Sequence, residues 1–155
     1  MVNSVMIVDD SVEDQYLTER SLSSAKLTTR FFLKNNGQEA FDFLKDYSAQ
    51  KKSFGDEIPP ALILLDINMP VMDGFEFLEK FEQLREQNPE LESVKIVMFS
   101  SSENQTDMDR AKAYDFVSDY WVKSVRPQEI IHRFKAPSDE KLLIIFKSKN
   151  CIIRI

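Results

Sequence analysis

The sequence is poor in cysteine, which forms disulfides, and in glycine, which builds phosphate-binding loops. It has one cysteine, Cys151, so no disulfide can form within a single copy. It has three glycines, and they do not cluster after the first expected strand as a flavin-binding loop would require. No apolar run reaches the roughly 18 residues of a membrane span, and no basic-then-apolar segment reads as a signal peptide. The expected compartment is therefore the cytoplasm.

Positive charge is also scarce. The 155 residues include 20 Lys and Arg against 26 Asp and Glu, a formal net charge of −6. This charge opposes contact with phosphate backbones and anionic membranes, so neither nucleic acid nor a membrane is an expected partner. Hydrophobic residues are plentiful, at 43% of the chain with 12 Phe. That composition suits one globular domain with a substantial core.

Short apolar runs alternate with longer amphipathic ones over the first 135 residues, which predicts an α/β fold with a parallel sheet. The expected strands are residues 5–8, 31–33, 61–65, 96–99 and 120–122. The expected helices are residues 14–24, 40–47, 75–84, 107–114 and 127–134. Residues 48–60 contain Gly55 and paired prolines, and we expect a long loop there.

Acidic residues follow two of the expected strands. Asp9 and Asp10 come directly after the first strand, and Asp66 stands at the end of the third. Because open parallel sheets bind ligands beyond the carboxyl ends of their strands, three carboxylates are expected to converge there. Such a cluster needs a compensating cation, and Mg²⁺ is the natural choice for oxygen ligands. Taken singly, each Asp is equally well a helix cap or a turn residue, and Asp10 can be both cap and ligand.

Two further polar residues stand at strand ends. Ser100 follows the fourth expected strand, and Lys123 ends the fifth. A hydroxyl and an ammonium directed at the carboxylates are what a phosphoryl group on Asp66 would need for its oxygens. Alone, Ser is usually a turn residue and Lys a solvated charge, so the interpretation rests on their shared position.

Four segments together resemble the receiver domain of two-component response regulators. They are VMIVDD at residues 5–10, LLDINMPVMDG at 64–74, VMFSSS at 97–102 and DYWVK at 119–123. The resemblance extends from residue 5 to about residue 134, and the combination is highly specific. It implies a flavodoxin-like five-stranded parallel sheet of order 2-1-3-4-5 with helices on both faces.

The resemblance also assigns roles to the acidic residues. It implies that Asp66 is the phosphoacceptor, as a carboxylate nucleophile. It implies that Asp10 and Asp66 ligate Mg²⁺ directly, that Asp9 acts mostly through water, and that Asn68 supplies a backbone carbonyl. Catalysis by such a domain is mainly positioning and charge stabilisation.

The remaining roles implied by the resemblance fall on the later strands. Ser100 and Lys123 would contact the phosphoryl oxygens, and a conformational switch would couple Ser100 to Tyr120. The chain is then a phosphoacceptor switch rather than an enzyme. Its expected partners are a sensor histidine kinase or phosphotransfer protein and an unknown downstream protein target.

Two competing functions use similar residues. An aspartate-nucleophile phosphatase also has a strand-end Asp and Mg²⁺, but it needs a second Asp two residues later, where this chain has Asn68. A receiver-like scaffold that is never phosphorylated is disfavoured by the intact acidic triad together with Lys123. The sequence therefore favours the phosphorylated switch.

The chain departs from the family after the fifth strand. Ser124 follows Lys123 where the family usually has a cis proline, and a cis bond without proline costs about 2.5 to 4 kcal/mol, so this loop is either trans or strained.

We assign residues 1–135 to the receiver domain and residues 136–155 to an apolar extension. Its runs at 142–146 and 151–155 suggest a β-hairpin, although 138–149 fits a helix equally well. Eight apolar residues there suggest an interaction surface, and we expect a homodimer through it.

Overall fold

The structure, a computed structural model, describes residues 2–124. Five strands and five α-helices follow one another along this part of the chain. The strands are β1 (Val5–Val8), β2 (Phe31–Lys34), β3 (Leu62–Leu65), β4 (Lys95–Ser100) and β5 (Val117–Val122). The helices are α1 (Val12–Ser24), α2 (Gly37–Lys45), α3 (Tyr47–Phe54), α4 (Gly74–Gln87) and α5 (Gln105–Ala111), with 3₁₀ turns η1 (Gly55–Glu57) and η2 (Pro89–Ser93).

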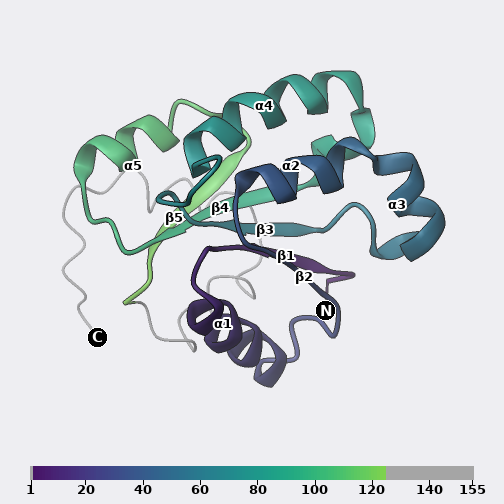
Figure 1. The fold of residues 1–155 in the computed structure, drawn as a ribbon, viewed down its shortest axis with the longest axis horizontal. Coiled ribbons are helices and arrows are strands. Elements are labelled where there is room, and N and C mark those ends of the chain that lie inside the picture. The colour runs from purple at the N-terminus through teal and green to yellow at the C-terminus, as the bar shows by residue number, and fades with distance from the viewer. Residues whose placement is uncertain (1, 125–155) are drawn as a thin grey trace.

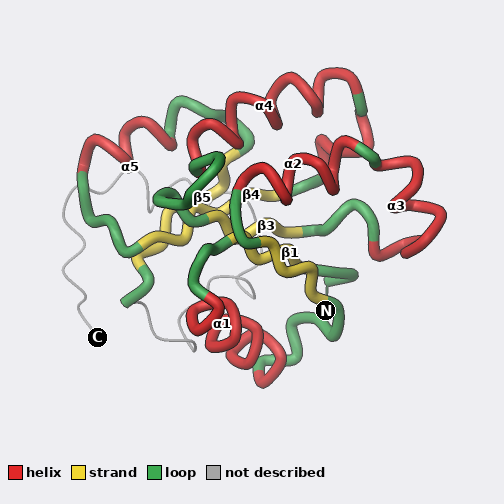
Figure 2. Tube along the Cα trace, viewed as in Figure 1, coloured by secondary structure: helices red, strands yellow, loops and turns green. Residues whose placement is uncertain are grey.

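The strands form one parallel sheet in the order β2-β1-β3-β4-β5. Figure 1 shows α1 on one face of this sheet and α2, α3, α4 and α5 on the other. The same layers are visible in Figure 2, where the yellow strands lie between the red helices. The predicted strand order and the predicted helices on both faces are therefore confirmed.

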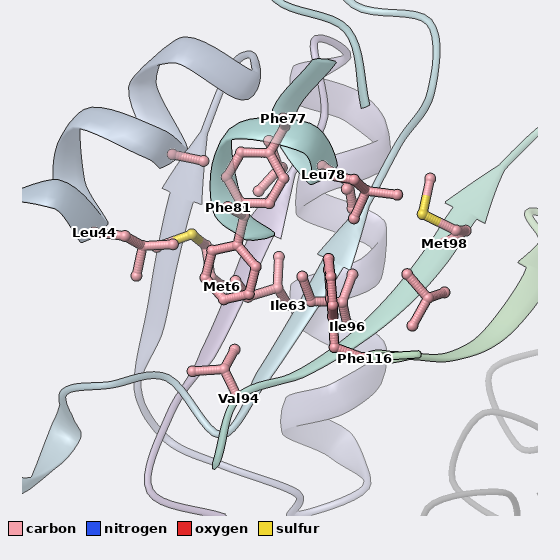
Figure 3. Packing of buried hydrophobic residues seen from close by; sticks show 14 of the residues in the cluster. Met6, Leu44, Ile63, Phe77, Leu78, Phe81, Val94, Ile96, Met98 and Phe116 are labelled. Carbon is pink, nitrogen blue, oxygen red and sulfur yellow. The ribbon is translucent and has the colours of Figure 1, made fainter. Parts of the chain in front are cut away.

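Side chains of both sheet faces are buried, which explains why the strands read as continuous apolar runs. Met6 and Val8 belong to the larger core cluster, and the alternate residues Val5 and Ile7 belong to the smaller one. The larger cluster packs the sheet against α2 and α4, with the stacked rings of Phe77 and Phe81 at its centre (Figure 3). The smaller cluster packs the opposite face against Leu22 of α1.

The loop predicted for residues 48–60 is wrong, because this stretch contains α3 and η1. Phe54 of α3 packs its ring 5.2 Å from Phe32 and 6.1 Å from Phe43, centroid to centroid. Gly55 ends the helix with a φ of 57°, a left-handed conformation that glycine adopts readily. The aromatic contact, which depends on the tertiary fold, thus outweighs the local turn signals.

Other differences concern the ends of elements. Strand β5 begins at Val117, three residues before the predicted strand. Among residues 2–124 the cis peptide bond is Ile58–Pro59, so the bond between Lys123 and Ser124 is trans. The helix predicted at residues 127–134 and the extension at 136–155 lie outside the described residues. Within residues 2–124, no helix combines the length and apolarity needed to cross a membrane.

Candidate functional site

The register of the sheet sets two acidic residues side by side. Val8 pairs with Leu65 across β1 and β3, so the next residues, Asp9 and Asp66, leave their strands at the same level. The Asp66 amide donates to the Val8 carbonyl oxygen at 2.9 Å and extends the pairing beyond the strands. The strand order reverses between β1 and β3, which is where open α/β sheets bind ligands.

Three carboxylates gather at this edge of the sheet. One oxygen each of Asp9, Asp10 and Asp66 lies within 4.8 Å of the other two. Asp9 and Asp66 are buried, whereas Asp10 is exposed. Burial raises the pKa of the Asp9 carboxyl, and hydrogen bonds from Lys123 and from the Ser11 amide offset part of that shift. Clustered carboxylate oxygens are the donors that a hard divalent cation prefers, so the residues present fit Mg²⁺.

Lys123 supplies the positive charge that faces this cluster. Its amide donates to the Ser100 carbonyl oxygen at 2.9 Å, which fixes the backbone beside the end of β4. Its Nζ lies 2.7 Å from Asp9 Oδ2, 2.8 Å from Asp14 Oδ2 and 3.0 Å from Asp66 Oδ2. Burial alone would lower the pKa of the ammonium, but hydrogen bonds with the three carboxylates outweigh it and hold that pKa above its ordinary value. Lys123 is therefore a permanent cation at the site.

Two residues of α1 take part that sequence reasoning missed. Ser11 caps the helix by accepting the Asp14 amide at 3.2 Å, so Asp14 stands in the first turn, close to the strand ends. The buried Gln15 side chain donates to the carbonyl oxygens of Asp9 at 2.6 Å and Lys34 at 3.0 Å, which ties the ends of β1 and β2 together. The sequence signal for Asp14 was its position in a helix that begins directly after the acidic pair.

A hydroxyl and an aromatic ring meet at the end of β4. Ser100 is buried, and its Oγ accepts the Ser102 amide at 3.2 Å. Tyr120 of the neighbouring β5 is also buried, and its hydroxyl donates to the Ser102 carbonyl oxygen at 2.9 Å. Burial raises the pKa of the Tyr120 phenol, and hydrogen bonds with Ser102 and Ser100 offset part of the shift. The two residues of the predicted switch are thus linked through Ser102, which each of them contacts.

The loop after β3 contains the last predicted site residue, Asn68, which is exposed. Asp66 Oδ1 accepts the Ile67 amide at 2.7 Å, and the Ile67 carbonyl oxygen accepts the Gly74 amide at 2.8 Å. These bonds close the loop and orient the Asp66 carboxylate, leaving Oδ2 toward Lys123. The role predicted for Asn68 concerns its backbone carbonyl and stays a prediction.

Residues 5–135 match the family model described as the response regulator receiver domain, so the chain belongs to this family. Among curated proteins, the response regulator Rcp1 of Synechocystis sp. is 30% identical over 104 residues, which is 67% of this chain and 65% of Rcp1. The match therefore spans a little less than two thirds of that relative.

Solved structures of response regulators are also similar to this chain. A response regulator receiver protein from Dyadobacter fermentans superimposes with a TM-score of 0.69 at 30% identity, covering 85% of this chain and 94% of that one. The Mn²⁺-bound form of Rcp1 superimposes with a TM-score of 0.63 at 27% identity, covering 84% of this chain and 87% of that one. Receiver domains act as phosphoacceptor switches in two-component signalling and interact with histidine kinases or phosphotransfer proteins.

Proposed function

We propose that this chain is a response regulator receiver domain that accepts a phosphoryl group on Asp66 in a Mg²⁺-dependent reaction. The observation that carries the proposal is the position of Lys123 Nζ, 3.0 Å from Asp66 Oδ2 within the acidic cluster. A buried carboxylate beside a fixed ammonium and two further carboxylates has both a nucleophilic oxygen and the charge needed to accept a phosphoryl group.

In the proposed reaction a carboxylate oxygen of Asp66 forms the new bond to phosphorus as the bond between phosphorus and the donor breaks. The Ile67 amide holds Oδ1, which leaves Oδ2 toward Lys123 as the attacking oxygen. The Lys123 ammonium then neutralises a phosphoryl oxygen, and the Ser100 hydroxyl donates to another. Most of the catalysis is thus positioning and charge stabilisation by groups already in place.

The proposed metal ligands are Asp9, Asp10, Asp66 and the backbone carbonyl of Asn68. The Mn²⁺-bound form of Rcp1 supports a divalent ion in this family. When bound, Mg²⁺ supplies positive charge that offsets the carboxylates and the incoming phosphoryl group. The protein's part is to hold the carboxylates together, which the adjacent ends of β1 and β3 accomplish.

The proposed output is a change of surface driven by Ser100 and Tyr120. The hydroxyl of Ser100 would move toward the phosphoryl group and so favour the inward orientation of the Tyr120 ring, which the ring already has beside Ser102 in this structure. A few kcal/mol of differential contact is enough to shift such a two-state population. The changed surface around β5 would then dock a downstream protein target.

The proposed partners follow from the same assignment. The phosphoryl donor is a sensor histidine kinase or a phosphotransfer protein, and the protein acts in the cytoplasm as a switch rather than as an enzyme. A net charge of −6 supports output through protein contacts and not through nucleic acid or a membrane. The homodimer through residues 136–155 remains part of this proposal and depends on the sequence alone.

The test is intact-mass analysis after incubation with Mg²⁺ and a small-molecule phosphodonor. We expect one added phosphoryl group on the wild-type protein, its loss on addition of a chelator, and its loss in Asp66→Asn, which keeps the shape but removes the nucleophile. Asp42→Asn, a matched substitution of an exposed aspartate on α2, should be labelled like the wild type. Stoichiometric labelling of Asp66→Asn would refute the assignment.

A further inference from the structure

Besides two carboxylates of the acidic cluster, Lys123 contacts a third carboxylate that lies outside the cluster. Asp14 comes from the first turn of α1, and its Oδ2 lies 2.8 Å from Lys123 Nζ. The carboxylates that gather closely enough to share a metal ion are those of Asp9, Asp10 and Asp66, and Asp14 is not among them. The Asp14 side chain is also more exposed, at 39%, than that of Asp9 at 2% or Asp66 at 9%.

The Lys123 ammonium also contacts two of the carboxylates that could share a metal ion. An ammonium has three N–H donors, and here three carboxylates lie within 3.0 Å of Nζ. Two of these contacts are to Asp9 Oδ2 and Asp66 Oδ2, both in the metal-binding cluster. A divalent cation held by these carboxylates would draw their charge away from the ammonium and would repel it, because both are positive. The contact with Asp14, which lies outside the cluster, would not be subject to this competition.

We propose that Asp14 is a positioning residue for Lys123, holding the ammonium at the border of the acidic cluster so that Mg²⁺ can take the carboxylates inside it. The inference rests on the proposed function, because it presumes that Mg²⁺ binds at this cluster. The contact between Asp14 and Lys123 stabilises the metal-bound form more than the metal-free form, in which Lys123 has two other carboxylates. Asp14 thereby strengthens Mg²⁺ binding without touching the ion.

An acidic residue in a first helical turn also stabilises the helix through its dipole, and this effect must be separated from the proposed one. Glu13 provides the matched control. It stands in the same turn with the same charge and is exposed, and it is not one of the three carboxylates that pair with Lys123. Glu13→Gln therefore reports the dipole effect and the general loss of one negative charge.

The test is a double-mutant cycle on the full chain, with the Mg²⁺ dissociation constant measured by isothermal titration calorimetry. Asp14→Asn should raise that constant about threefold to tenfold, while Glu13→Gln should change it less than twofold. Lys123→Gln should lower it, because the competing ammonium is gone. In the Lys123→Gln background, Asp14→Asn should have no more effect than Glu13→Gln, and Asp14→Glu in the native background should recover part of the affinity.

The outcomes separate this inference from the proposed function. If Asp14→Asn weakened Mg²⁺ binding equally with and without Lys123, or did not weaken it at all, Asp14 would not act through Lys123. That result would refute this inference and leave the proposed function intact. If the wild-type protein bound no Mg²⁺ at millimolar concentration, the proposed function would fall as well. Thermal unfolding of each variant without metal checks that a change in affinity does not come from loss of the fold.

Discussion

Asp9 illustrates, at the scale of one residue, how a functional site costs stability. Its side chain is almost fully buried and lies beside the carboxylate of Asp66. Burial raises its pKa, which means that the folded protein disfavours the charged form. Lys123 offsets only part of this penalty. The charge is retained because the proposed metal ion needs it.

We therefore expect Asp9→Asn to stabilise the protein in the presence of a chelator. The folded pKa of Asp9 lies above the unfolded value of 3.8, so its stabilising contribution is full below that pH and is lost as pH rises through the folded pKa. Asparagine imitates the protonated form, and Lys123 keeps Asp14 and Asp66 as partners. Chemical denaturation at pH 7 should show a gain of roughly 1 kcal/mol.

The pH dependence and a neighbouring residue test this explanation. The gain should shrink as the pH is lowered toward 4, where Asp9 itself takes up a proton. Asp10→Asn removes an exposed carboxylate from the same cluster and should change stability by less than about 0.5 kcal/mol. An Asp9→Asn variant that is less stable than the wild type at pH 7 would contradict the argument.

At the scale of elements, the connection from β3 to α4 fixes the proposed phosphoacceptor. Asp73 caps α4 in a capping box with Glu76, and the Gly74 amide donates to the Ile67 carbonyl oxygen. A Cβ atom on Gly74 would lie 2.3 Å from the carbonyl oxygen of Asp66. The absence of a side chain at Gly74 thus lets α4 begin directly against the backbone of the site.

Gly74→Ala should impair both stability and phosphorylation. The added methyl group forces the Asp66 backbone or the start of α4 to shift, and such overpacking costs roughly 1 to 3 kcal/mol. A displaced Asp66 carboxylate should also slow phosphorylation roughly tenfold or more. Denaturation and the rate of labelling by a small phosphodonor measure the two effects on the same sample.

Gly55→Ala is the matched control for that prediction. Gly55 has a φ of 57°, and a Cβ atom there meets nothing within 4 Å, so only backbone strain of about 1 kcal/mol is expected. Its rate of phosphorylation should equal that of the wild type because α3 and η1 contribute nothing to the site. Equal rates in Gly74→Ala and wild type would show that the contact with Asp66 does not matter.

At the scale of the whole molecule, the homodimer stays a prediction from sequence. Residues 136–155 lie outside the described residues, and the argument depends on their apolar runs. Truncation after Ala136 should convert a dimer to a monomer in light scattering, while phosphorylation of Asp66 persists because the site lies within residues 9–123. A full-length protein that stays monomeric at high micromolar concentration would exclude the dimer.

The sequence by itself identified the strands of the sheet and most of the residues that the structure gathers at the candidate site. Buried parallel strands are apolar on both faces, so five short apolar runs were recognisable without any tertiary information. Residues at strand ends, such as Asp9, Asp66 and Lys123, could be grouped because parallel strands all end at the same edge. The resemblance to receiver domains then supplied the strand order, which periodicity alone does not contain.

Only the tertiary structure decided the contacts that depend on packing between distant elements. The helix α3 replaces an expected loop because the Phe54 ring packs against the rings of Phe32 and Phe43. The local sequence does not predict that contact. The ion pair of Asp14 with Lys123 joins residues 109 positions apart. This ion pair depends on how α1 is capped and on which face of the first turn of α1 meets the end of β5. The direction of the Asp14 side chain is thus determined by the folded backbone rather than by residue type.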